Sequence, residues 1–408
     1  MNNIKRLDVD FLIIGSGIVG LTLALNLKQK FPTKKVVIIE KESSLGYHSS
    51  GRNSGVLHAG FYYTPDSLKA KFTRQGNEEL TKYCEKKGLK INRCGKVVVA
   101  KNEQELDTLN ELKRRGDKNS VELYLIDEKQ LKEIEPNAKT YKYALWSPRT
   151  STVDPQEVLN SIKEDLVNLG VEFYFNTPYK KKLDDNSIMA GNYIFSTGKI
   201  INTAGLYADR IAKEFGFGEK YVIMPFKGIY VEHTGESKFI KTNIYPVPNI
   251  KNPFLGVHFT IKVDGTVKIG PTAIPCFWRE NYKGFSGFNL KEFFEVFKWE
   301  SSLFLRNSTF RNLAFDEMKK YYKPYLINEA GKLVNHIPKQ EFNKWGKPGI
   351  RAQLLNINTL ELVNDFVIEG DKNSIHILNA VSPAFTASIP FTRFVVENYI
   401  MEEKNGKV

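Results

Sequence analysis

The feature that most constrains the fold of this chain is a glycine-rich turn between two apolar segments near its beginning. Residues 10–14 form an apolar run, residues 15–20 read Gly-Ser-Gly-Ile-Val-Gly, and residues 21–27 are apolar without the alternation of a strand. This order predicts a strand, a tight turn and a helix. A second buried strand is predicted at 36–39, and it ends at Glu40, twenty residues past the last glycine of the turn. Together these elements predict a dinucleotide-binding βαβ unit.

Each part of this unit has a physical task in holding a dinucleotide. Gly15 permits the turn, Gly17 lets the backbone approach a pyrophosphate, and Gly20 lets the helix pack against the strand. The start of the helix offers unpaired N–H groups and a positive dipole to the phosphates. Glu40 is expected to accept hydrogen bonds from the ribose hydroxyls. The cofactor-binding residues predicted here are Gly15, Gly17, Ile18, Val19, Gly20, Glu40 and Lys41.

The rest of the chain alternates between two kinds of sequence pattern, and this alternation predicts two domains. Segments 94–146 and 221–337 are rich in Tyr, Phe and Trp and contain short strand-like runs, such as 254–260 and 267–270. The predicted fold class is α/β with an α+β second domain. A Rossmann-like dinucleotide-binding domain is predicted from residues 1–93, 147–220 and 338–408, and an antiparallel-sheet substrate-binding domain from residues 94–146 and 221–337.

Two further strand ends in the first domain are predicted to reach the cofactor. The elements predicted beyond the opening unit are a helix from Asp154 to Gly170, strands at 171–175, 199–202 and 375–379, and a helix from Ser382 to Ile400. The small residues Thr203, Ala204 and Gly205 follow one strand, where a ligand is expected to approach the backbone. Ser382, Pro383 and Ala384 follow another, at the sheet edge where ligands collect.

Composition and charge limit the classes of function. The chain has 59 Lys and Arg against 46 Asp and Glu, a net charge of +13. Its basic clusters are short and lack interleaved aromatic residues, so no nucleic-acid partner is expected. The longest apolar stretch, 11–25, contains glycines and is too short to span a membrane. Three scattered cysteines and no room for a signal peptide predict a reducing, cytoplasmic location. No iron–sulfur or heme motif is present, and no metal is expected.

With the glycine turn and Glu40, the segment 50–63, SGRNSGVLHAGFYY, resembles the L-2-hydroxyglutarate dehydrogenase/oxidase family, within the glycine-oxidase and D-amino-acid-oxidase-like flavoproteins. Further matching stretches are 67–71, 243–248, 256–260, 349–353 and 382–384, so the likeness spans nearly the whole chain. The resemblance implies FAD as the cofactor, oxidation of L-2-hydroxyglutarate to 2-oxoglutarate, and electron transfer to a membrane quinone or another acceptor. It also implies that Arg52, Asn53, Ser54 and Gly55 lie beside the isoalloxazine ring.

Two segments depart from the family pattern. Residues 225–230 read Pro-Phe-Lys-Gly-Ile-Tyr where the family has Pro-Phe-Arg-Gly, an acidic residue and Tyr. Residues 379–385 read Asn-Ala-Val-Ser-Pro-Ala-Phe where the family has Asn-Ala-Pro-Ser-Pro-Ala-Ala. Lysine cannot make the planar two-bond contact of arginine with a carboxylate. If Lys227 lies at the substrate, its hold on a distal carboxylate differs, so a close 2-hydroxy dicarboxylate is a second candidate substrate.

Candidate catalytic residues follow from the chemistry that the resemblance implies. Arg351 matches the carboxylate-binding arginine of amino-acid-oxidizing relatives, and its guanidinium can bind both oxygens of an α-carboxylate. Oxidation of an alcohol requires a base for the hydroxyl proton, and a neutral imidazole suits that task. His58 and His258 are both candidates, and His258 is expected inside a strand, on one face with Gly256 and Thr260. The remaining candidates for the base are Tyr62, Tyr63 and Tyr245.

The helix that starts at Ser382 is expected to direct its positive end at the flavin N1/C2 carbonyl and stabilise reduced flavin. The chain has one dinucleotide fingerprint, so the electrons must leave to an external acceptor, quinone or oxygen. The basic surface and an aromatic run at 293–304 predict peripheral contact with an anionic membrane, in a bacterial cell the inner membrane, although aromatics at helical spacing usually belong to a core. Alternative functions are a sarcosine or amino-acid oxidase and a flavin-containing RNA-modifying protein.

Overall fold

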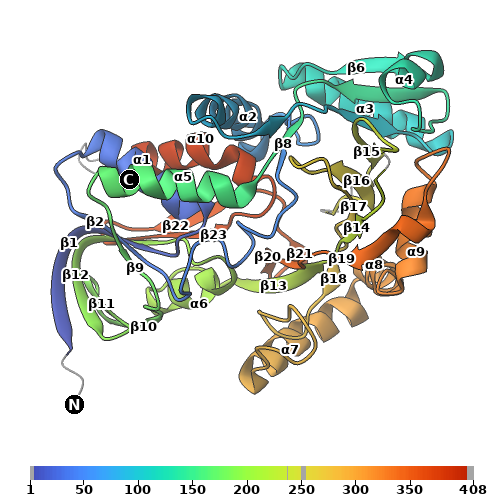
Figure 1. Ribbon diagram of the computed structural model, residues 1–408. Helices are drawn as coiled ribbons and strands as arrows, with labels where there is room; N and C mark the ends of the chain where they lie inside the picture. Colours follow the sequence, from blue (N-terminus) through green and yellow to red (C-terminus); the bar gives the residue numbers. More distant parts are fainter. Residues whose placement is uncertain (1–3, 237, 250–253, 402–408) are drawn as a thin grey trace.

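A computed structural model describes residues 4–236, 238–249 and 254–401 (Figure 1). Its α-helices are α1 (Ile18–Lys30), α2 (Leu68–Lys86), α3 (Gln104–Lys118), α4 (Glu128–Ile134), α5 (Pro155–Asn168), α6 (Ala208–Glu214), α7 (Leu290–Arg306), α8 (Ser308–Lys319), α9 (Lys323–Gly331) and α10 (Ala384–Val396). Short 3-10 turns cover Gly205–Tyr207 and Lys339–Glu341, and a π turn, Glu397–Met401, follows α10. In Figure 1, α1, α5 and α10 lie on one side of the molecule and α7, α8 and α9 on the other.

An eight-stranded sheet forms the side that contains the glycine turn. Its strands are β1 (Lys5–Ile14), β2 (Val36–Ile39), β9 (Glu172–Tyr174), β10 (Tyr179–Asp184), β11 (Ser187–Ala190), β12 (Tyr193–Asn202), β22 (Val367–Gly370) and β23 (Ser374–Asn379). Strands β9, β2, β1, β12 and β23 are parallel neighbours in that order. Every residue of β2 is buried, as expected for a parallel strand covered on both faces. The predicted βαβ unit is confirmed as β1, α1 and β2.

Helices α1, α5 and α10 cover one face of this sheet, and α2 packs against α10 (Figure 1). The start of α5 is the one predicted, because the Asp154 side chain accepts hydrogen bonds from the N–H groups of Gln156 at 2.7 Å and Glu157 at 3.2 Å, and Pro155 occupies the first turn. The start of α10 differs from the prediction. Its N-cap residue is Pro383, and Ser382 makes no side-chain capping hydrogen bond.

The remaining strands of the described chain form three further sheets. The second eight-stranded sheet has the spatial order β19 (Phe342–Trp345), β14 (Val231–His233), β17 (Val267–Gly270), β16 (His258–Ile261), β15 (Asn243–Pro246), β5 (Lys96–Val99), β7 (Tyr143–Ser147) and β6 (Tyr124–Asp127). A four-stranded sheet contains β18 (Ile274–Pro275), β13 (Tyr221–Gly228), β20 (Gly349–Asn356) and β21 (Glu361–Leu362), and a three-stranded sheet contains β3 (Val56–Leu57), β8 (Ser151–Val153) and β4 (Ile91–Asn92). These pairs are antiparallel except for β15 with β5.

The predicted fold class, α/β with an α+β second part, is confirmed. The strand predicted at 254–260 begins only at His258, so this residue starts β16 and does not lie in its middle. Helices α3, α4, α7, α8 and α9 were not predicted within the aromatic-rich segments. Strands β19 and β20 fall within the predicted range 338–408 but pair with β14 and β13 of the range 221–337. The division into an FAD-binding and a substrate-binding domain stays a prediction.

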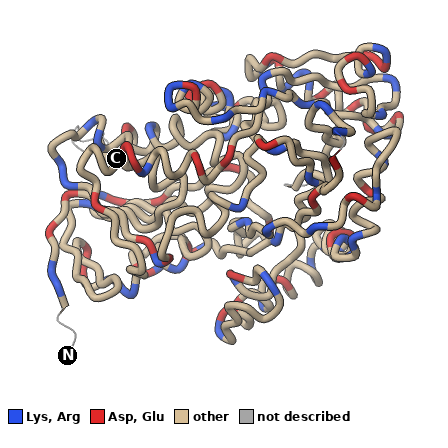
Figure 2. The backbone as a smooth tube through the Cα atoms, viewed as in Figure 1, with Lys and Arg blue, Asp and Glu red and all other residues tan. Residues whose placement is uncertain are grey.

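Lys and Arg positions are spread along the backbone tube in Figure 2 and are mixed with Asp and Glu positions. They form no continuous basic stripe in this view, so the view offers no support for the RNA-binding alternative. No helix among residues 4–236, 238–249 and 254–401 is long and apolar enough to cross a membrane. Cys84, Cys94 and Cys276 are all free thiols.

Candidate active site

A cavity of about 640 Å³ lies at the carboxyl ends of β1, β2, β12 and β23 and extends to the second sheet. Of the predicted site residues, the cavity is lined by Gly15, Gly17, Ile18, Val19, Glu40, Lys41, Arg52, Asn53, Ser54, His58, Thr203, Ala204, Gly205, Tyr245, His258, Arg351, Ser382, Pro383 and Ala384. Gly20, Gly55, Tyr62 and Lys227 do not line it. The cavity therefore brings together residues from segments that are far apart in the sequence, at the sheet edge where open α/β sheets bind ligands.

The glycine turn leaves the start of α1 open toward the cavity. Gly15 has a φ of +104°, and a Cβ on it would lie 2.8 Å from the carbonyl oxygen of Thr203. A Cβ on Gly20 would lie 2.1 Å from the Gly15 carbonyl oxygen, so this glycine keeps α1 close to the turn and does not touch the cavity. The N-cap residue, Gly17, has no side chain to cap the helix. N–H groups at a helix start in such a cradle fit a pyrophosphate.

Two charged residues follow β2 at the edge of this cradle. One Glu40 carboxylate oxygen accepts hydrogen bonds from the Ser16 N–H at 2.9 Å and the Ser16 hydroxyl at 2.7 Å. The other Glu40 oxygen accepts a hydrogen bond from the Glu42 N–H at 3.0 Å. Because a carboxylate offers about four acceptor sites, Glu40 retains capacity for one ribose hydroxyl. Lys41 forms ion pairs with Glu42, at 2.7 Å, and with Glu280. Because Glu280 lies more than two hundred residues away in the sequence, this contact joins the cradle to the loop before α7.

The loop at residues 49–55 crosses the cavity next to the cradle. The Ser50 hydroxyl accepts a hydrogen bond from the Ile18 N–H at 3.0 Å. The Arg52 guanidinium lies over the Tyr282 ring, 4.4 Å from its centroid, and donates to the Pro348 carbonyl at 3.2 Å. Gly55 does not line the cavity. It packs closely against β8, since a Cβ at this position would lie 2.2 Å from the Val153 carbonyl oxygen.

His258 lies at the other end of the cavity in a fixed orientation. Its Nδ1 is 2.7 Å from the Gly256 carbonyl oxygen, so Nδ1 carries the proton and Nε2 has a free lone pair. Its ring stacks on Tyr245 with a centroid separation of 3.7 Å and an angle of 20°. Burial is the main reason that the pKa of His258 is lowered to about 3. The hydrogen bond to Gly256 acts in the opposite direction, and the nearby cations act in the same direction as burial. The imidazole is therefore neutral near pH 7.

His58 is the second imidazole at this end. Its backbone N–H donates to the Thr386 hydroxyl at 3.1 Å, which fixes the chain next to α10. Its Nδ1 is buried and has no hydrogen-bond partner among the described residues. Burial and, to a smaller extent, the charges of Lys96 and Arg351 hold the pKa of His58 well below its usual value. This histidine is also neutral near pH 7, and its orientation is less fixed than that of His258.

Arg351, on β20, is a cation without a counterion at the cavity. It forms no ion pair with any carboxylate of the described residues, and its guanidinium lies 5.4 Å from the centroid of the Phe254 ring. Burial lowers the pKa of Arg351 from its usual range, although the charge of Glu317 acts in the opposite direction. Such a group fits an anionic ligand, because a buried charge is stable only when it is paired.

Three predicted catalytic candidates, Lys227, Tyr62 and Tyr63, do not line the cavity. The Lys227 ammonium is 3.3 Å from the Asn281 side-chain oxygen and 5.9 Å from the centroid of the Tyr321 ring, while the next residue, Gly228, lines the cavity. The register of β13 therefore turns Lys227 away, and the expectation that it contacts a distal carboxylate is not supported. The Tyr62 hydroxyl is buried without a hydrogen-bond partner among the described residues. Tyr63 does not line the cavity either.

Sequence reasoning missed three buried lysines, of which Lys96 and Lys268 act on the charge state of His258 and Lys69 is affected by the charge of Arg351. Lys69, Lys96 and Lys268 are each at most 7% exposed, and none forms an ion pair within the described part of the chain. Burial lowers the pKa of Lys69 and Lys268 to about 8 and that of Lys96 to about 7. A sequence signal exists for two of them: Lys96 precedes Val-Val-Val, and Lys268 lies between Val267 and Ile269, so both are cations inside buried strands. Tyr230, which lines the cavity, was also missed.

The βαβ cradle and the cavity at the carboxyl ends of the parallel strands define a dinucleotide-binding protein. Residues 10–388 match the family described as FAD dependent oxidoreductase, and FAD is its cofactor. The chain belongs, within this class, to the L-2-hydroxyglutarate dehydrogenase family. It is 36% identical to the L-2-hydroxyglutarate dehydrogenase of Indibacter alkaliphilus, over 96% of this chain and 98% of that protein. It is 35% identical to the mitochondrial enzyme of the same name from Nematostella vectensis, over 95% and 90%.

Solved structures show the same fold at lower sequence identity. An L-α-glycerophosphate oxidase from Mycoplasma pneumoniae, with FAD bound, superposes with a TM-score of 0.72 at 23% identity, over 96% of this chain and 94% of that one. Glycine oxidase from Geobacillus kaustophilus superposes with a TM-score of 0.70 at 16% identity, over the same shares. The resemblance inferred from the sequence is confirmed.

Proposed function

We propose that this chain oxidises L-2-hydroxyglutarate to 2-oxoglutarate. The observation that carries the proposal is the uncompensated Arg351 at a cavity that also holds two neutral histidines. The names of the curated relatives support the substrate. The cradle at the start of α1 fits FAD, which when bound supplies N5 as the acceptor of a hydride from the substrate's Cα. The remaining steps belong to residues of the chain.

Arg351 is proposed to bind the α-carboxylate of the substrate. A planar guanidinium can donate two parallel hydrogen bonds to a carboxylate, which fixes both the position and the direction of the neighbouring Cα. Glu317, whose charge acts on Arg351, is paired with Lys320, and no described carboxylate forms an ion pair with Arg351. Its charge also acts on both histidines, which places all three groups in one electrostatic environment.

We assign the base to His258, with His58 as the alternative that the experiment must exclude. The Nδ1 of His258 donates to the Gly256 carbonyl, so Nε2 is free to accept the hydroxyl proton of the substrate. The pKa of about 3 belongs to a site without substrate. A dianionic substrate brings negative charge next to the imidazole, and this raises the pKa toward a value suited to a base. His58 lacks the hydrogen bond that fixes one tautomer at Nδ1.

The charges of the site favour a hydroxy acid over an amino acid. The cavity end near His258 is surrounded by Arg351, Lys96 and Lys268, each of which acts on this histidine. A 2-hydroxy dicarboxylate brings two negative charges and no positive one. An amino acid brings an ammonium group, which like-charge repulsion and desolvation disfavour here. The sarcosine or amino-acid oxidase alternative is therefore the weaker candidate.

The test is anaerobic reduction of the FAD-loaded protein, which is measured by the loss of its visible flavin absorbance. L-2-Hydroxyglutarate is expected to bleach the flavin, and the D enantiomer, L-lactate, L-glutamate and sarcosine serve as matched controls. L-Lactate removes the distal carboxylate, and L-glutamate exchanges the hydroxyl for an ammonium. Faster bleaching by L-glutamate or sarcosine than by the hydroxy acid would reverse the assignment to a hydroxy-acid enzyme.

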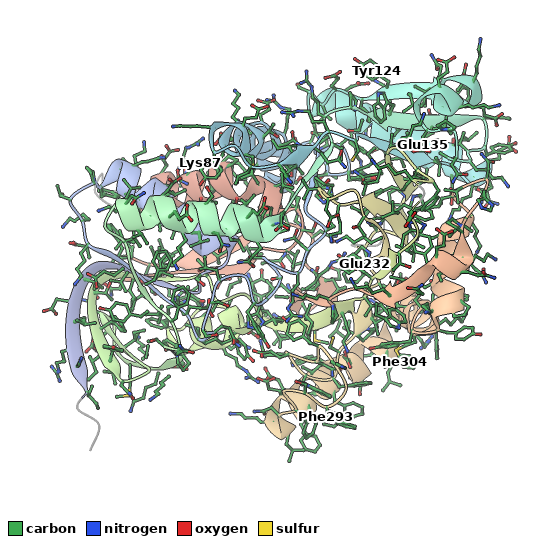
Figure 3. All side chains as sticks on the ribbon, viewed as in Figure 1. Lys87, Tyr124, Glu135, Glu232, Phe293 and Phe304 are labelled. Carbon is green, nitrogen blue, oxygen red and sulfur yellow. The ribbon has the colours of Figure 1, made fainter. Side chains whose placement is uncertain are left out.

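We further propose that the enzyme contacts an anionic membrane and passes its electrons to quinone. The supporting feature is an exposed apolar region on and around α7 and α8, which we call the α7–α8 surface. Its exposed side chains are Phe277, Phe285, Phe288, Leu290, Phe294, Phe297, Leu305, Phe315, Met318, Tyr321 and Tyr322. Helix α7 lies at the periphery of the molecule, with Phe293 near its start and Phe304 near its end (Figures 1 and 3). The aromatic run is thus only partly core.

The charges of this surface suit an anionic partner. Glu292, Glu300 and Glu317 are buried, and Glu280, Glu295 and Asp316 are held in ion pairs. The exposed charged side chains without an ion pair to another described residue are Lys283, Lys291, Lys298, Arg306 and Lys319. Exposed aromatic and basic side chains together are the composition of interfacial helices, which bind anionic lipid headgroups.

Sedimentation with phosphatidylglycerol vesicles at low salt tests the membrane contact, with phosphatidylcholine vesicles as the control. The double variant Phe294→Ser, Phe297→Ser is expected to stay in solution, whereas Tyr124→Ser, an exposed aromatic outside the α7–α8 surface, is expected to sediment like the parent. If the parent protein does not sediment with the vesicles, the proposed membrane contact is contradicted, while the proposed reaction is unaffected. Mixing substrate-reduced enzyme with a soluble quinone or with aerated buffer tests the acceptor, and faster reoxidation in air would make the protein an oxidase.

A further inference from the structure

Lys96, on β5, is a fully buried lysine that the proposed chemistry does not yet use. Its side chain is 0% exposed, and its ammonium nitrogen has no hydrogen-bond partner among the described residues. No carboxylate of the described chain forms an ion pair with it. A lysine in such a position is costly to bury, because neither water nor a counterion compensates its charge. Because burial of this unpaired cation destabilises the fold, its presence indicates a role in the site.

Three aromatic rings surround the Lys96 ammonium. Its nitrogen lies 4.5 Å from the centroid of Tyr245, 5.0 Å from that of Tyr62 and 5.3 Å from that of Phe61. Ring faces attract a cation, and the attraction is largest where water is absent. The cage therefore favours the ammonium form against the effect of burial. It also explains why Tyr62, a predicted catalytic candidate, lies next to the cavity without lining it.

The same Tyr245 ring connects Lys96 to the proposed base. Strand β15, which carries Tyr245, lies between β5 and β16 in the second eight-stranded sheet. Asn243 pairs with Lys96 on one side, and Ile244 pairs with Phe259 on the other. The Tyr245 ring stacks on His258 at 3.7 Å and lies beneath the Lys96 ammonium. The sheet register thus fixes a row of ammonium, phenol ring and imidazole.

Among the described residues, the charged groups that act most strongly on His258 are cations. Arg351 acts on it from β20, Lys268 from β17 and Lys96 from β5. His58 is neutral and lies close enough to be affected by the same charges. Tyr245, on β15, and Tyr230 are buried phenols with pKa values raised above their usual range, so they add no negative charge. Among these groups Lys96 is the one that neither lines the cavity nor makes a hydrogen bond.

We propose that Lys96 is a positioning residue whose caged charge adds to the effect of burial and helps to keep His258 in the neutral form that accepts the substrate proton. The residue acts through Tyr245 and through space, and it does not touch the substrate. The proposal rests on the proposed function only for the task of His258. The charge state of His258 itself can be measured without any turnover, so the failure of one proposal is distinguishable from the failure of the other.

The direct test is NMR of the FAD-loaded protein labelled on histidine. The chain has only six histidines, so the His258 resonance can be assigned by comparison with His258→Gln. In the parent, His258 is expected to remain neutral from pH 8 to about pH 5, well below the usual titration range. Lys96→Met keeps an apolar stem and removes the charge. It is expected to raise the imidazolium fraction at pH 5 by about tenfold, and Lys96→Arg, which keeps the charge, by much less.

Lys28→Met is the matched control, because Lys28 is a buried lysine of α1 whose ammonium binds only the backbone carbonyls of Pro32 and Lys34. It is expected to leave the His258 titration unchanged. An unchanged imidazolium fraction in Lys96→Met, or an equal change in Lys96→Arg, would overturn the proposal. If Lys96→Met does not fold, Lys96→Gln provides the same comparison, and a parent His258 that titrates near pH 6.5 overturns the proposal without any variant.

A kinetic measurement adds the link to catalysis. The rate of anaerobic flavin reduction by L-2-hydroxyglutarate is expected to fall at low pH, as the base becomes protonated. Lys96→Met is expected to move this decline upward by about one pH unit while the KM changes little. A lowered rate at every pH with no shift of the decline would indicate a structural role for Lys96 and contradict the proposal. No flavin reduction by the parent would contradict the proposed function and leave the NMR result valid.

Discussion

The two ends of the cavity are built in different ways. At the cofactor end, backbone groups and small residues follow directly on parallel strands, as at Gly15 after β1 and Thr203 after β12. At the substrate end, long side chains converge from separate sheets, as do His258 from β16 and Arg351 from β20. The cofactor end therefore depends on the path of the backbone, and the substrate end on the charge and protonation of a few side chains. The two ends should fail separately when mutated.

The largest expected effect is at the cofactor end. Gly20→Ala is expected to give protein with little or no FAD, because the added Cβ would lie 2.1 Å from the Gly15 carbonyl oxygen and must push α1 away from the turn. The ratio of flavin to protein absorbance after purification measures the loss. Gly331→Ala, at the end of α9, is the matched control and should retain flavin. Full flavin content in Gly20→Ala would remove the claim that backbone packing decides this end.

At the substrate end, His258→Gln is expected to retain FAD and slow anaerobic flavin reduction by about 100-fold or more, the usual cost of removing a general base. Stopped-flow absorbance measures the rate. The surface variant His336→Gln should behave like the parent. A larger loss in His58→Gln than in His258→Gln would transfer the role of base to His58, and equal parental rates in both would direct attention to Tyr245.

A smaller effect is expected for the carboxylate contact. Arg351→Ala should raise the KM for the hydroxy acid by about 10- to 100-fold at constant flavin content, because hydrogen bonds to charged groups contribute about 1.5–3 kcal/mol. Arg351→Lys should recover only part of the loss, since lysine lacks the planar pair of donors. Steady-state kinetics with a soluble acceptor measures the change. An unchanged KM in Arg351→Ala would show that the carboxylate binds elsewhere.

The smallest effect concerns stability below neutral pH. Burial lowers the pKa of His258 to about 3 and that of His376 to about 4, whereas an unfolded histidine titrates near 6.5. Between these values the unfolded chain binds more protons, so stability falls as the pH drops below about 6.5, by up to about 1.4 kcal/mol per pH unit for each histidine. Thermal unfolding from pH 7 to 5 should show a shallower decline in His258→Gln. An identical slope would mean that His258 is charged in the folded protein.

The difference between the two ends also explains what the sequence could predict. The cofactor end was predictable because glycines at a fixed spacing after a strand encode their own geometry, and Gly15, Gly17 and Glu40 lie at the cavity as expected. The substrate end depends on which strands become neighbours. Lys96 meets Tyr245 only because β5 pairs with β15, nearly 150 residues later in the chain. No local pattern contains that pairing, so Lys96 was missed.

Strand register explains why Lys227 does not line the cavity. Lys227 and Gly228 are consecutive on β13, and a strand places consecutive residues on opposite faces, so only one of them can face the cavity. The family comparison identifies the position but not the face. The aromatic side chains of helices α7 and α8 are divided between a core and an exposed surface. A run of aromatic residues in the sequence does not distinguish these two environments, so the two helices were not predicted.

The order in which the chain closes its first sheet has a consequence for synthesis in the cell. Strand β23 completes the parallel sheet beside β12, α10 packs against α1, and residues 380–386 line the cavity that Gly15 begins. The ribosome therefore synthesises the glycine turn more than 350 residues before residues 380–386, which complete the lining of the cavity. Until then the apolar face of α1 has no partner from α10, and long-range closure of this kind is slow. A chain that ends before residue 380 lacks this part of the cavity lining, so we expect stable FAD binding only after α10 has packed against α1.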